Sequence, residues 1–332
     1  MADKGARIGL LGATGALGSE VLAALDASSI RVAGLVPVAT DRSVGEDIEF
    51  QGELYPVETQ WPRLENLDLV FCCAPAEASL EVVRGALRAR VPCVDCSGAL
   101  LGSPEVPVGV AALAAEADAG SPVVSAPAGP ALPWSLVLAP LHAAAGITRV
   151  VGTVLEAASV MGRDGIEALS AESLALFNQR DLPSPDAAGR PLAFDCLPAV
   201  GTVGEDGSTP REAEVALGLR RILAADLDVV VSVIQVPAFV GQASQLLLET
   251  ERPLDPKQAR DLLASAPGVE CWVHDAEGPN LRAVAGRETV VAGRIRPAPT
   301  SPSALLLWIA ADLLRLAAAN AVALASARLP PR

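Results

Sequence analysis

A turn between two apolar segments has the form of a loop that carries a catalytic nucleophile. The apolar run at 122–126 predicts a buried strand, and the residues after Pro127-Ala128-Gly129-Pro130 predict a hydrophobic helix. A reactive side chain at such a turn would lie at the positive end of the helix dipole, which favours a nucleophilic anion. This turn contains no reactive side chain. The sequence therefore has the frame of a covalent active site without its nucleophile.

Three glycines near the start of the chain have the spacing of a dinucleotide-binding loop. They follow an apolar strand expected at 7–11 and precede a helical pattern at 19–25. Glycines allow the backbone to approach a pyrophosphate, and the helix N-terminus supplies amide donors. The expected cofactor contacts are Gly12, Thr14, Gly15, Ala16, Leu17 and Gly18. A tight turn that binds nothing is the alternative interpretation.

The residues after the second expected strand favour NADP as the cofactor. That strand covers 31–38, and Arg42 and Ser43 follow it closely. A guanidinium and a hydroxyl at this place suit the 2′-phosphate that distinguishes NADP from NAD. Asp41 leaves NAD open, because an acidic residue here can bind the ribose hydroxyl.

The six cysteines indicate reduced thiols rather than a metal site or a disulfide framework. Cys93 and Cys96 form a C-x-x-C pattern in an expected strand, where residues three apart point to opposite faces. No second pair and no nearby histidine completes a set of metal ligands. The other four cysteines are Cys72, Cys73, Cys196 and Cys271.

The composition limits the kinds of partner. The chain has 332 residues, of which 51% are hydrophobic, and a formal net charge of −14. Such a charge argues against nucleic acid and against anionic membrane surfaces. Asp312 and Arg315 interrupt the late apolar stretch 303–329, so a membrane span there would be costly. Because no charged-then-apolar leader precedes the first strand, we expect a cytoplasmic protein.

The order of the expected elements predicts an α/β fold with a Rossmann-type, doubly wound parallel sheet and a second, α+β domain. Strands at 67–73 and 91–95 flank a helix at 77–88. Later strands are expected at 149–159, 192–196, 228–236 and 245–250, and helices at 165–177, 210–224 and 255–264. A last helix at 303–328 is expected to return to the first domain. The boundaries are therefore 1–126 with 303–332 for the nucleotide-binding domain, and 127–302 for the α+β domain.

Many segments, in their order and spacing, resemble the aspartate-semialdehyde dehydrogenase family along nearly the whole chain. They include RIGLLGATGALGSEVL, ATDRSVG, VFCCAPAEAS, VDCSGALLGSPEVPV, ASVMGRDG, QVPAFVGQ and LLLWIAADLLR. The resemblance implies an NADP-binding Rossmann domain and a dimerising α+β domain. It also implies an oxidoreductase family of amino-acid biosynthesis, which reduces aspartyl phosphate to its semialdehyde through a thioester on a cysteine.

Carried over by position, the catalytic groups of this family are absent here. Gly129 stands where the resemblance places the nucleophilic cysteine, and Gln242 where it places the general-base histidine. Gln235 replaces the arginine that holds the substrate carboxylate. The two histidines, His142 and His274, lie elsewhere in the sequence.

The remaining departures change the charge of the expected site. Glu214 replaces an active-site lysine, Leu101 the phosphate-binding arginine, and Glu156 the glutamine beside the thioester. The glycine motif, Arg42 and Ser43 remain. In these departures the chain resembles the Usg-like proteins, paralogues of the family that also lack the cysteine.

Three interpretations follow. The first is a catalytically silent member, a pseudoenzyme that keeps the fold, the dimer and the NADP site. The second is an NADP-dependent oxidoreductase with non-covalent chemistry, in which Glu156 or Glu214 acts as acid or base. The third is an active semialdehyde dehydrogenase that uses a displaced thiol, with Cys96 as the nearest candidate.

We expect a homodimer formed through the second domain. The long expected strands carry apolar residues that require burial, namely Val229, Val231, Val233 and Leu246. A heterodimer with an active homologue is the other possible partner arrangement.

Overall fold

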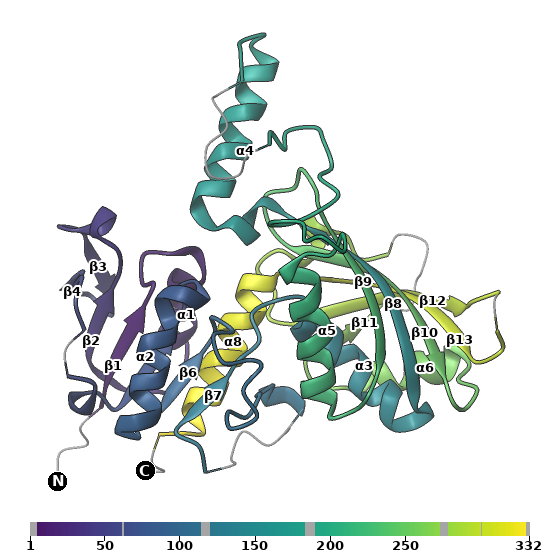
Figure 1. The fold of residues 1–332 in the computed structure, drawn as a ribbon, viewed down its shortest axis with the longest axis horizontal. Helices are drawn as coiled ribbons and strands as arrows, with labels where there is room; N and C mark the ends of the chain where they lie inside the picture. Colours follow the sequence, from purple (N-terminus) through teal and green to yellow (C-terminus); the bar gives the residue numbers. More distant parts are fainter. Residues whose placement is uncertain are drawn as a thin grey trace. The chain divides into compact units, whose positions relative to one another are not determined.

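The computed structural model describes residues 5–61, 63–113, 120–182, 190–272, 278–299 and 301–329. The chain forms two compact units, one made of residues 1–128 and 317–332 and the other of residues 129–316 (Figure 1). Among the helices of these described residues, none has the length and apolarity needed to cross a membrane.

The first unit is built on a five-stranded sheet in which every pairing is parallel, in the order β2-β1-β5-β6-β7. Its strands are β1 (Ala6–Leu11), β2 (Val32–Val38), β5 (Leu69–Cys72), β6 (Cys93–Asp95) and β7 (Val123–Ser125). The helices are α1 (Ala16–Asp26), α2 (Ala76–Ala89) and most of α8 (Leu313–Ser326). A small hairpin, β3 (Asp47–Phe50) with β4 (Glu53–Pro56), is separate from this sheet. The expected doubly wound parallel sheet is confirmed.

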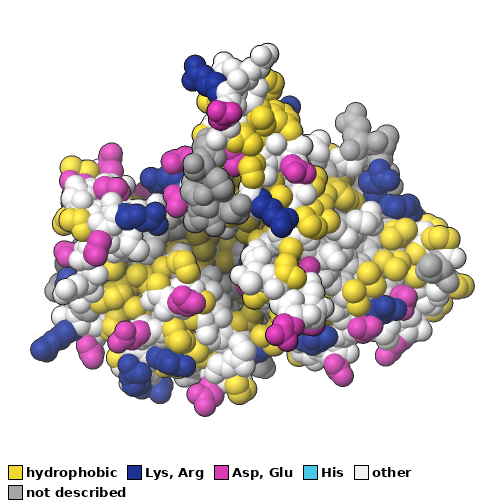
Figure 2. All heavy atoms as spheres, turned by 45° about the horizontal axis from the view of Figure 1, so that its top comes forward, with side chains coloured by type: hydrophobic (Ala, Val, Ile, Leu, Met, Phe, Trp, Pro, Cys, Tyr) yellow, Lys and Arg dark blue, Asp and Glu magenta, His cyan; other side chains and the backbone are white. Residues whose placement is uncertain are grey.

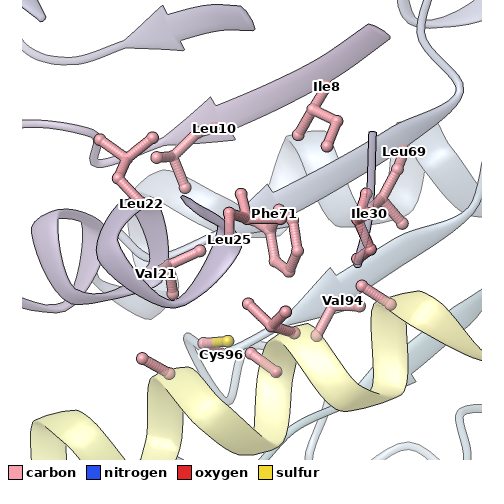
Figure 3. Close-up of a cluster of buried hydrophobic side chains, with 14 of the residues drawn as sticks. Ile8, Leu10, Val21, Leu22, Leu25, Ile30, Leu69, Phe71, Val94 and Cys96 are labelled. Carbon is pink, nitrogen blue, oxygen red and sulfur yellow. The ribbon is translucent and has the colours of Figure 1, made fainter. Parts of the chain in front are cut away.

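Helices cover both faces of this sheet because the short strands are apolar on both sides. Ile8, Leu10 and Phe71 pack with α1 and with the small residues Ala318 and Ala321 of α8 (Figure 3). A second cluster on the sheet contains Val70, Cys72 and Cys93 together with Val83 and Ala86 of α2. The two clusters divide the C-x-x-C pair, since Cys96 belongs to the first and Cys93 to the second.

The second unit contains a mixed six-stranded sheet in the order β11-β12-β13-β10-β8-β9. Its strands are β8 (Ile147–Glu156), β9 (Asp228–Gln235), β10 (Gln242–Thr250), β11 (Val269–Cys271), β12 (Val290–Pro297) and β13 (Ala304–Ala311). Its helices are α3 (Ala131–Ala145), α4 (Gly162–Phe177), α5 (Pro210–Leu223), α6 (Pro256–Ala264) and α7 (Leu281–Val284). The expected α+β architecture of this region is therefore confirmed.

Helix α3 is the core of the second unit. It is apolar on all sides, and Leu132, Trp134 and Leu138 are fully buried. Trp134 packs directly on Gly152 of β8, where an added Cβ would lie 2.3 Å from the indole ring. The indole Nε1 donates a hydrogen bond of 2.9 Å to Ser244 on β10. A glycine in the strand thus allows the tryptophan to reach the sheet and find its polar partner.

The opposite face of this sheet is apolar and only partly covered. The register places Val151, Val230 and Leu247 on it, and 46% of Val230 is exposed. From the sequence we expected a dimer surface that carries Val229, Val231, Val233 and Leu246, and this was wrong because these residues lie on the other face of the sheet. Strand alternation puts these four on the helix-covered face, where Val233 and Leu246 are already fully buried.

Helix α4 extends away from the sheet of its unit (Figure 1). Leu174 and Phe177 near its end are exposed by 59% and 76%, and the Phe177 ring meets Phe194 edge to face. Hydrophobic side chains are visible on this helix in Figure 2.

Two expected elements were wrong. The single helix at 303–328 is a strand, β13, followed by helix α8. The run Ala304–Ala311 is apolar on both faces, so its pattern has no period, and hydrogen bonds to β10 and β12 decide its conformation. The strand at 192–196 is a turn, because the amides of Leu192 and Ala193 donate to the Glu172 carboxylate instead of to a strand.

Candidate functional site

The first unit contains a pocket of about 690 Å³ at the carboxyl ends of its strands. The chain leaves β1 toward β2 on one side and reaches β5 on the other, so the pocket lies where the strand order reverses. Of the expected cofactor contacts, Gly12, Thr14, Gly15 and Arg42 line it. A pocket of this size suits a nucleotide-sized ligand.

Two glycines of the loop are required by close backbone packing. Gly12 has φ +77°, and an added Cβ there would lie 2.8 Å from the Ala74 amide nitrogen. An added Cβ at Gly18 would lie only 2.1 Å from the Gly12 carbonyl oxygen. Helix α1 therefore begins tight against the end of β1, with Gly15 as its N-cap and Ala16 and Leu17 in its first turn. This cradle fits the phosphates of a dinucleotide.

Ser43 and Arg42 have different surroundings. Both belong to a single turn of 3-10 helix, Asp41–Ser43, after β2. Arg42 lines the pocket, whereas Ser43 is buried and its hydroxyl lies 3.0 Å from that of Thr14. The Thr14–Ser43 hydrogen bond joins the loop after β2 to the glycine loop, and it holds Arg42 at the rim of the pocket.

Sequence reasoning missed the rest of the pocket wall. Trp61, Cys73, Ala78, Val82 and Gly85 also line the pocket. The segment VFCCAPAEAS contains Cys73 and Ala78, but it was not assigned to the cofactor site, because the lining residues come from separate places, namely α2, the end of β5 and a loop. The usable signal is topological: residues that follow neighbouring parallel strands meet at one edge of the sheet.

In the second unit, three expected positions form one row across the sheet. Glu156 of β8 pairs with Gln242 of β10 on one side and with Gln235 of β9 on the other. Directly opposed residues project from the same face of a sheet. All three are buried, with 1%, 1% and 4% of their surfaces exposed, respectively. Positions that are 79 or more residues apart from Glu156 are thereby brought together.

Arg211, which sequence reasoning did not single out, connects this row to Glu214. Its Nη2 donates to Glu156 Oε1 at 2.7 Å, and its Nε donates to the same oxygen at 3.2 Å. Its Nη1 donates to Glu214 Oε2 at 3.0 Å. Burial alone would lower the pKa of Arg211, but the charges of Glu156 and Glu214 outweigh it and raise the pKa.

The start of helix α5 fixes Arg211 in place. Thr209 caps the helix, and the Glu212 side chain closes a capping box back onto the Thr209 amide. The other oxygen of Glu212 accepts the Val233 amide hydrogen bond, which ties the helix to β9. These contacts place Arg211, the second residue of α5, within hydrogen-bond distance of Glu156 at the end of β8. The i, i+3 spacing of Arg211 and Glu214 was the signal available in the sequence.

Gly129 lies against this ion-pair cluster. An added Cβ at Gly129 would lie 3.0 Å from Arg211 Nη1 and 3.3 Å from Glu214 Oε1. A side chain at the expected nucleophile position would thus compete with the Arg211–Glu214 ion pair for space. We call Gly129, Glu156, Arg211, Glu214, Gln235 and Gln242 the polar cluster.

Three buried polar atoms of this cluster have no hydrogen-bond partner, namely Glu156 Oε2, Gln235 Nε2 and Gln242 Oε1. The Gln242 Nε2 donates to Ser244 at 3.0 Å, so only one end of that amide is used. A buried polar atom without a partner is costly, and such atoms mark places where a ligand or water can bind.

Cys96 is poorly suited to act as a displaced nucleophile. It is buried, with 6% of its surface exposed. The pKa of the Cys96 thiol is raised well above its usual value, chiefly by two causes: the larger is a hydrogen bond with Cys73, and the smaller is burial. The thiolate is the reactive form, so this environment suppresses nucleophilic attack. Cys72 and Cys93 form a second close pair, with their sulfur atoms 4.0 Å apart.

Asp95, at the end of β6, is a buried carboxylate of a different kind. It is fully buried, and its Oδ2 has no hydrogen-bond partner. Burial raises the pKa of Asp95, although hydrogen bonds from Ser97 oppose the shift.

The remaining expected positions do not join the polar cluster by any described contact. Leu101 belongs to the first unit and is buried. His142 lies in the last turn of α3, where its Nδ1 accepts a hydrogen bond from the Ile147 amide. His274 lies outside the described residues. The described residues contain no group of three or more His, Cys, Asp or Glu that could hold a metal ion.

Comparison with known proteins gives the same division of the chain. Residues 7–120 match the family model "Semialdehyde dehydrogenase, NAD binding domain", and residues 138–316 match "Semialdehyde dehydrogenase, dimerisation domain". Aspartate-semialdehyde dehydrogenase of Aquifex aeolicus is 29% identical over 97% of both chains. The USG-1 protein homolog of Pseudomonas aeruginosa is 29% identical over 96% of both chains.

A solved structure has nearly the same fold. Aspartate semialdehyde dehydrogenase II of Vibrio cholerae, complexed with ASA, is similar with a TM-score of 0.91 and 25% sequence identity, over 98% of both chains.

Proposed function

Because the chain belongs to the semialdehyde dehydrogenase family, with an NAD(P)-binding domain and a dimerisation domain, we propose that it is an NADP-binding homodimer without phosphorylating dehydrogenase activity. Its relatives are named both as aspartate-semialdehyde dehydrogenases and as USG-1 protein homologs. The proposal assigns this chain to the second kind, a member that has kept the nucleotide site and lost the covalent chemistry.

The contact of Gly129 with the ion pair of Arg211 and Glu214 carries this proposal. Thioester chemistry needs a thiolate at the turn before α3, and Gly129 offers only backbone. Arg211 Nη1 lies 3.0 Å from the point that a Cβ would occupy. Gln242 cannot exchange protons near neutral pH, so the general-base function is absent as well. An NADPH-linked assay in both directions is expected to detect no phosphate-dependent turnover.

The assay also tests the displaced-thiol alternative. Turnover that a thiol reagent abolishes would contradict the proposal and would make Cys96 or Cys196 the nucleophile. Cys196 is exposed, whereas Cys96 is buried. The variants Cys96→Ser and Cys196→Ser would then separate the two.

Arg42 supports the preference for NADP over NAD. It lines the pocket at the end of β2, where a guanidinium can pair with a 2′-phosphate. When bound, the nicotinamide cofactor would supply a hydride. Fluorescence titration is expected to give tighter binding of NADPH than of NADH by about tenfold, which is one charge-assisted contact. Arg42→Ala should remove the preference, and Arg149→Ala in the second unit should leave it unchanged. Equal affinities in the unmodified protein would refute the NADP assignment.

The partly covered sheet face supports a homodimer. Val151, Val230 and Leu247 form an apolar surface on the dimerisation domain, opposite the helices. Such a surface requires a partner, and a second copy of the same chain offers the same surface. Light scattering at micromolar concentration is expected to give twice the mass of the chain. A monomer mass would contradict the homodimer and leave the heterodimer with an active homologue as the candidate.

A second candidate function is NADP-dependent hydride transfer without a covalent step. Glu156 favours it, because its Oε2 is buried and has no partner, so it is available to accept a hydrogen bond from a substrate. A screen of small aldehydes and ketones with NADPH tests this function. Turnover that is lost in Glu156→Gln, with NADPH binding intact, would replace the proposal of a silent protein.

A further inference from the structure

The polar cluster has an excess of acceptors. Glu156 and Glu214 have a formal charge of −1 each, and Arg211 has a charge of +1, so the three together are negative. Every nitrogen of the Arg211 guanidinium is already bound to a carboxylate oxygen of the cluster. An anionic ligand would therefore be repelled by the two carboxylates, and Arg211 would have no unused donor nitrogen to bind it.

Glu156 Oε2 is the strongest recognition element of the cluster. Only 1% of Glu156 is exposed, and Arg211 binds its other oxygen, Oε1. The cost of leaving a buried carboxylate oxygen without a donor is high, and a donor that carries a positive charge compensates it best. The amides of Gln235 and Gln242 could be turned so that their oxygen and nitrogen atoms exchange places, whereas Glu156 Oε2 is an acceptor in either arrangement.

The row across the sheet supplies one further acceptor beside Glu156. Gln242 and Gln235 lie on the neighbouring strands, and the atom without a partner is the acceptor Oε1 at Gln242 and the donor Nε2 at Gln235. An amide oxygen at Gln242 can share the hydrogens of a group that Glu156 already binds. Arg211 and Glu214 have 18% and 38% of their side chains exposed, so the cluster is accessible from that side.

We propose that the polar cluster binds the ammonium group of a small primary amine, with Glu156 Oε2 as its anchor. This inference rests on the proposed function, because a covalent intermediate at residue 129 would occupy the same place. An ammonium group has three hydrogens and one charge, which match the acceptors and the net charge of the cluster. Carboxylates and phosphates are disfavoured, since they would approach Glu156 and Glu214 without a free cation.

The test uses three matched probes on the full chain without nucleotide, measured by ligand-observed NMR. The first is 4-aminobutan-1-ol, the second its N,N,N-trimethyl derivative, and the third 4-hydroxybutyrate. The primary amine should bind at least tenfold more tightly than the trimethyl derivative, which keeps the charge but has no hydrogen to donate. The carboxylate should not bind. Equal binding of the two cations would overturn the proposal, because it would reflect only the net charge of −14.

Variants locate the site. Glu156→Gln removes the anchor and should weaken amine binding at least tenfold. Glu251→Gln makes the same change of charge at a residue whose side chain is 63% exposed, and it should have no effect. Equal binding by Glu156→Gln and the unmodified protein would overturn the assignment. Gln235→Arg restores a cation in the row and should exchange the preference, so that 4-hydroxybutyrate binds and the amine does not.

NADPH titration of the same preparation separates this inference from the proposed function. If NADPH binds and the amine does not, only the inference about the amine is wrong. If the amine binds and NADPH does not, the nucleotide part of the proposed function is wrong and the cluster assignment remains. The three probes decide the question in the unmodified protein, whatever the stability of the variants.

Discussion

The pocket of the first unit leaves polar groups available to a ligand, whereas the polar cluster of the second unit pairs most of its charged groups with one another. In the pocket, Gly12 and Gly18 lack side chains because backbone packs against backbone there: an added Cβ would lie 2.8 Å from the Ala74 nitrogen and 2.1 Å from the Gly12 carbonyl oxygen, respectively. In the cluster, Gly129 also lacks a side chain, but its neighbours are the ends of two side chains, with Arg211 Nη1 at 3.0 Å and Glu214 Oε1 at 3.3 Å from an added Cβ. The first arrangement leaves recognition groups for a ligand, whereas the second satisfies most of its charges internally. A missing side chain therefore does not by itself indicate a binding site; the groups that border its place decide what the site can bind.

The sharpest test of this contrast is an attempt to restore the family chemistry. Gly129→Cys together with Gln242→His supplies a thiol and a base, yet we expect phosphorylating activity to remain absent. In an enzyme with a covalent mechanism, loss of the nucleophile alone lowers kcat about a millionfold. In this variant Arg211 Nη1 and Glu214 Oε1 would still lie 3.0 and 3.3 Å from the new Cβ, and the only cation of the polar cluster is already bound to its two carboxylates. The NADPH-linked assay measures the outcome, with mass spectrometry after thiol labelling as the control for an intact Cys side chain. Substantial turnover would mean that the cluster rearranges easily.

The polar cluster should depend on its cation. Arg211→Met leaves Glu156 buried without its partner, so we expect a loss of about 3–5 kcal/mol in the free energy of unfolding. The comparison is Arg149→Met, which breaks an ion pair with Asp228 whose side chains are 45% and 61% exposed. That change should cost less than about 1 kcal/mol. Urea unfolding measures both, and similar losses would contradict the internal compensation described for the cluster.

The pocket should depend instead on the absence of side chains. Gly18→Ala places a Cβ against the Gly12 carbonyl, so helix α1 must shift, at a cost of about 1–3 kcal/mol. NADPH binding should be lost with it. Gly34→Ala on β2 is the matched control, since the nearest atom to its Cβ would be 3.9 Å away. Thermal unfolding and fluorescence titration give the two readouts. Unchanged binding by Gly18→Ala would remove the glycine loop from the cofactor site.

Asp95 extends the comparison to a buried carboxylate of the first unit. Burial raises the pKa of Asp95, so the folded protein keeps this proton to a higher pH than the unfolded chain does. Stability should therefore fall as pH rises from the ordinary aspartate pKa of about 3.9 to the raised value in the fold. Asp95→Asn should remove this part of the pH dependence, and Ser97→Ala, which deletes an opposing hydrogen bond, should strengthen it. Urea unfolding between pH 4 and pH 7 measures the difference, and parallel curves for the three proteins would refute the assignment.

The glycine loop and the parallel sheet were accessible from the sequence because their signals are local. Gly12 and Gly18 lie within one strand–turn–helix unit, and their spacing reflects contacts inside that unit. Strand β13 was not accessible in the same way. Its residues are apolar on both faces, so only the neighbouring strands distinguish it from the helix that was expected.

The polar cluster was predictable in composition but not in arrangement. The resemblance named Glu156, Gln235 and Gln242 as expected site positions, yet it did not reveal that they form one row. That row depends on the register of β8 with β9 and β10, which involves strands distant in the sequence. Arg211 was missed for the same reason, because an arginine in the first turn of a helix is ordinary until its partners are known.

The contact between Gly129 and Arg211 also bears on how residue 129 communicates with the sheet. With the guanidinium held by Glu156 and Glu214, a side chain introduced at residue 129 would place its Cβ 3.0 Å from Arg211 Nη1. The guanidinium would then have to shift by a few tenths of an ångström. Because the same guanidinium binds Glu156, that shift would be transmitted from the turn before α3 to the row of buried side chains on β8, β9 and β10.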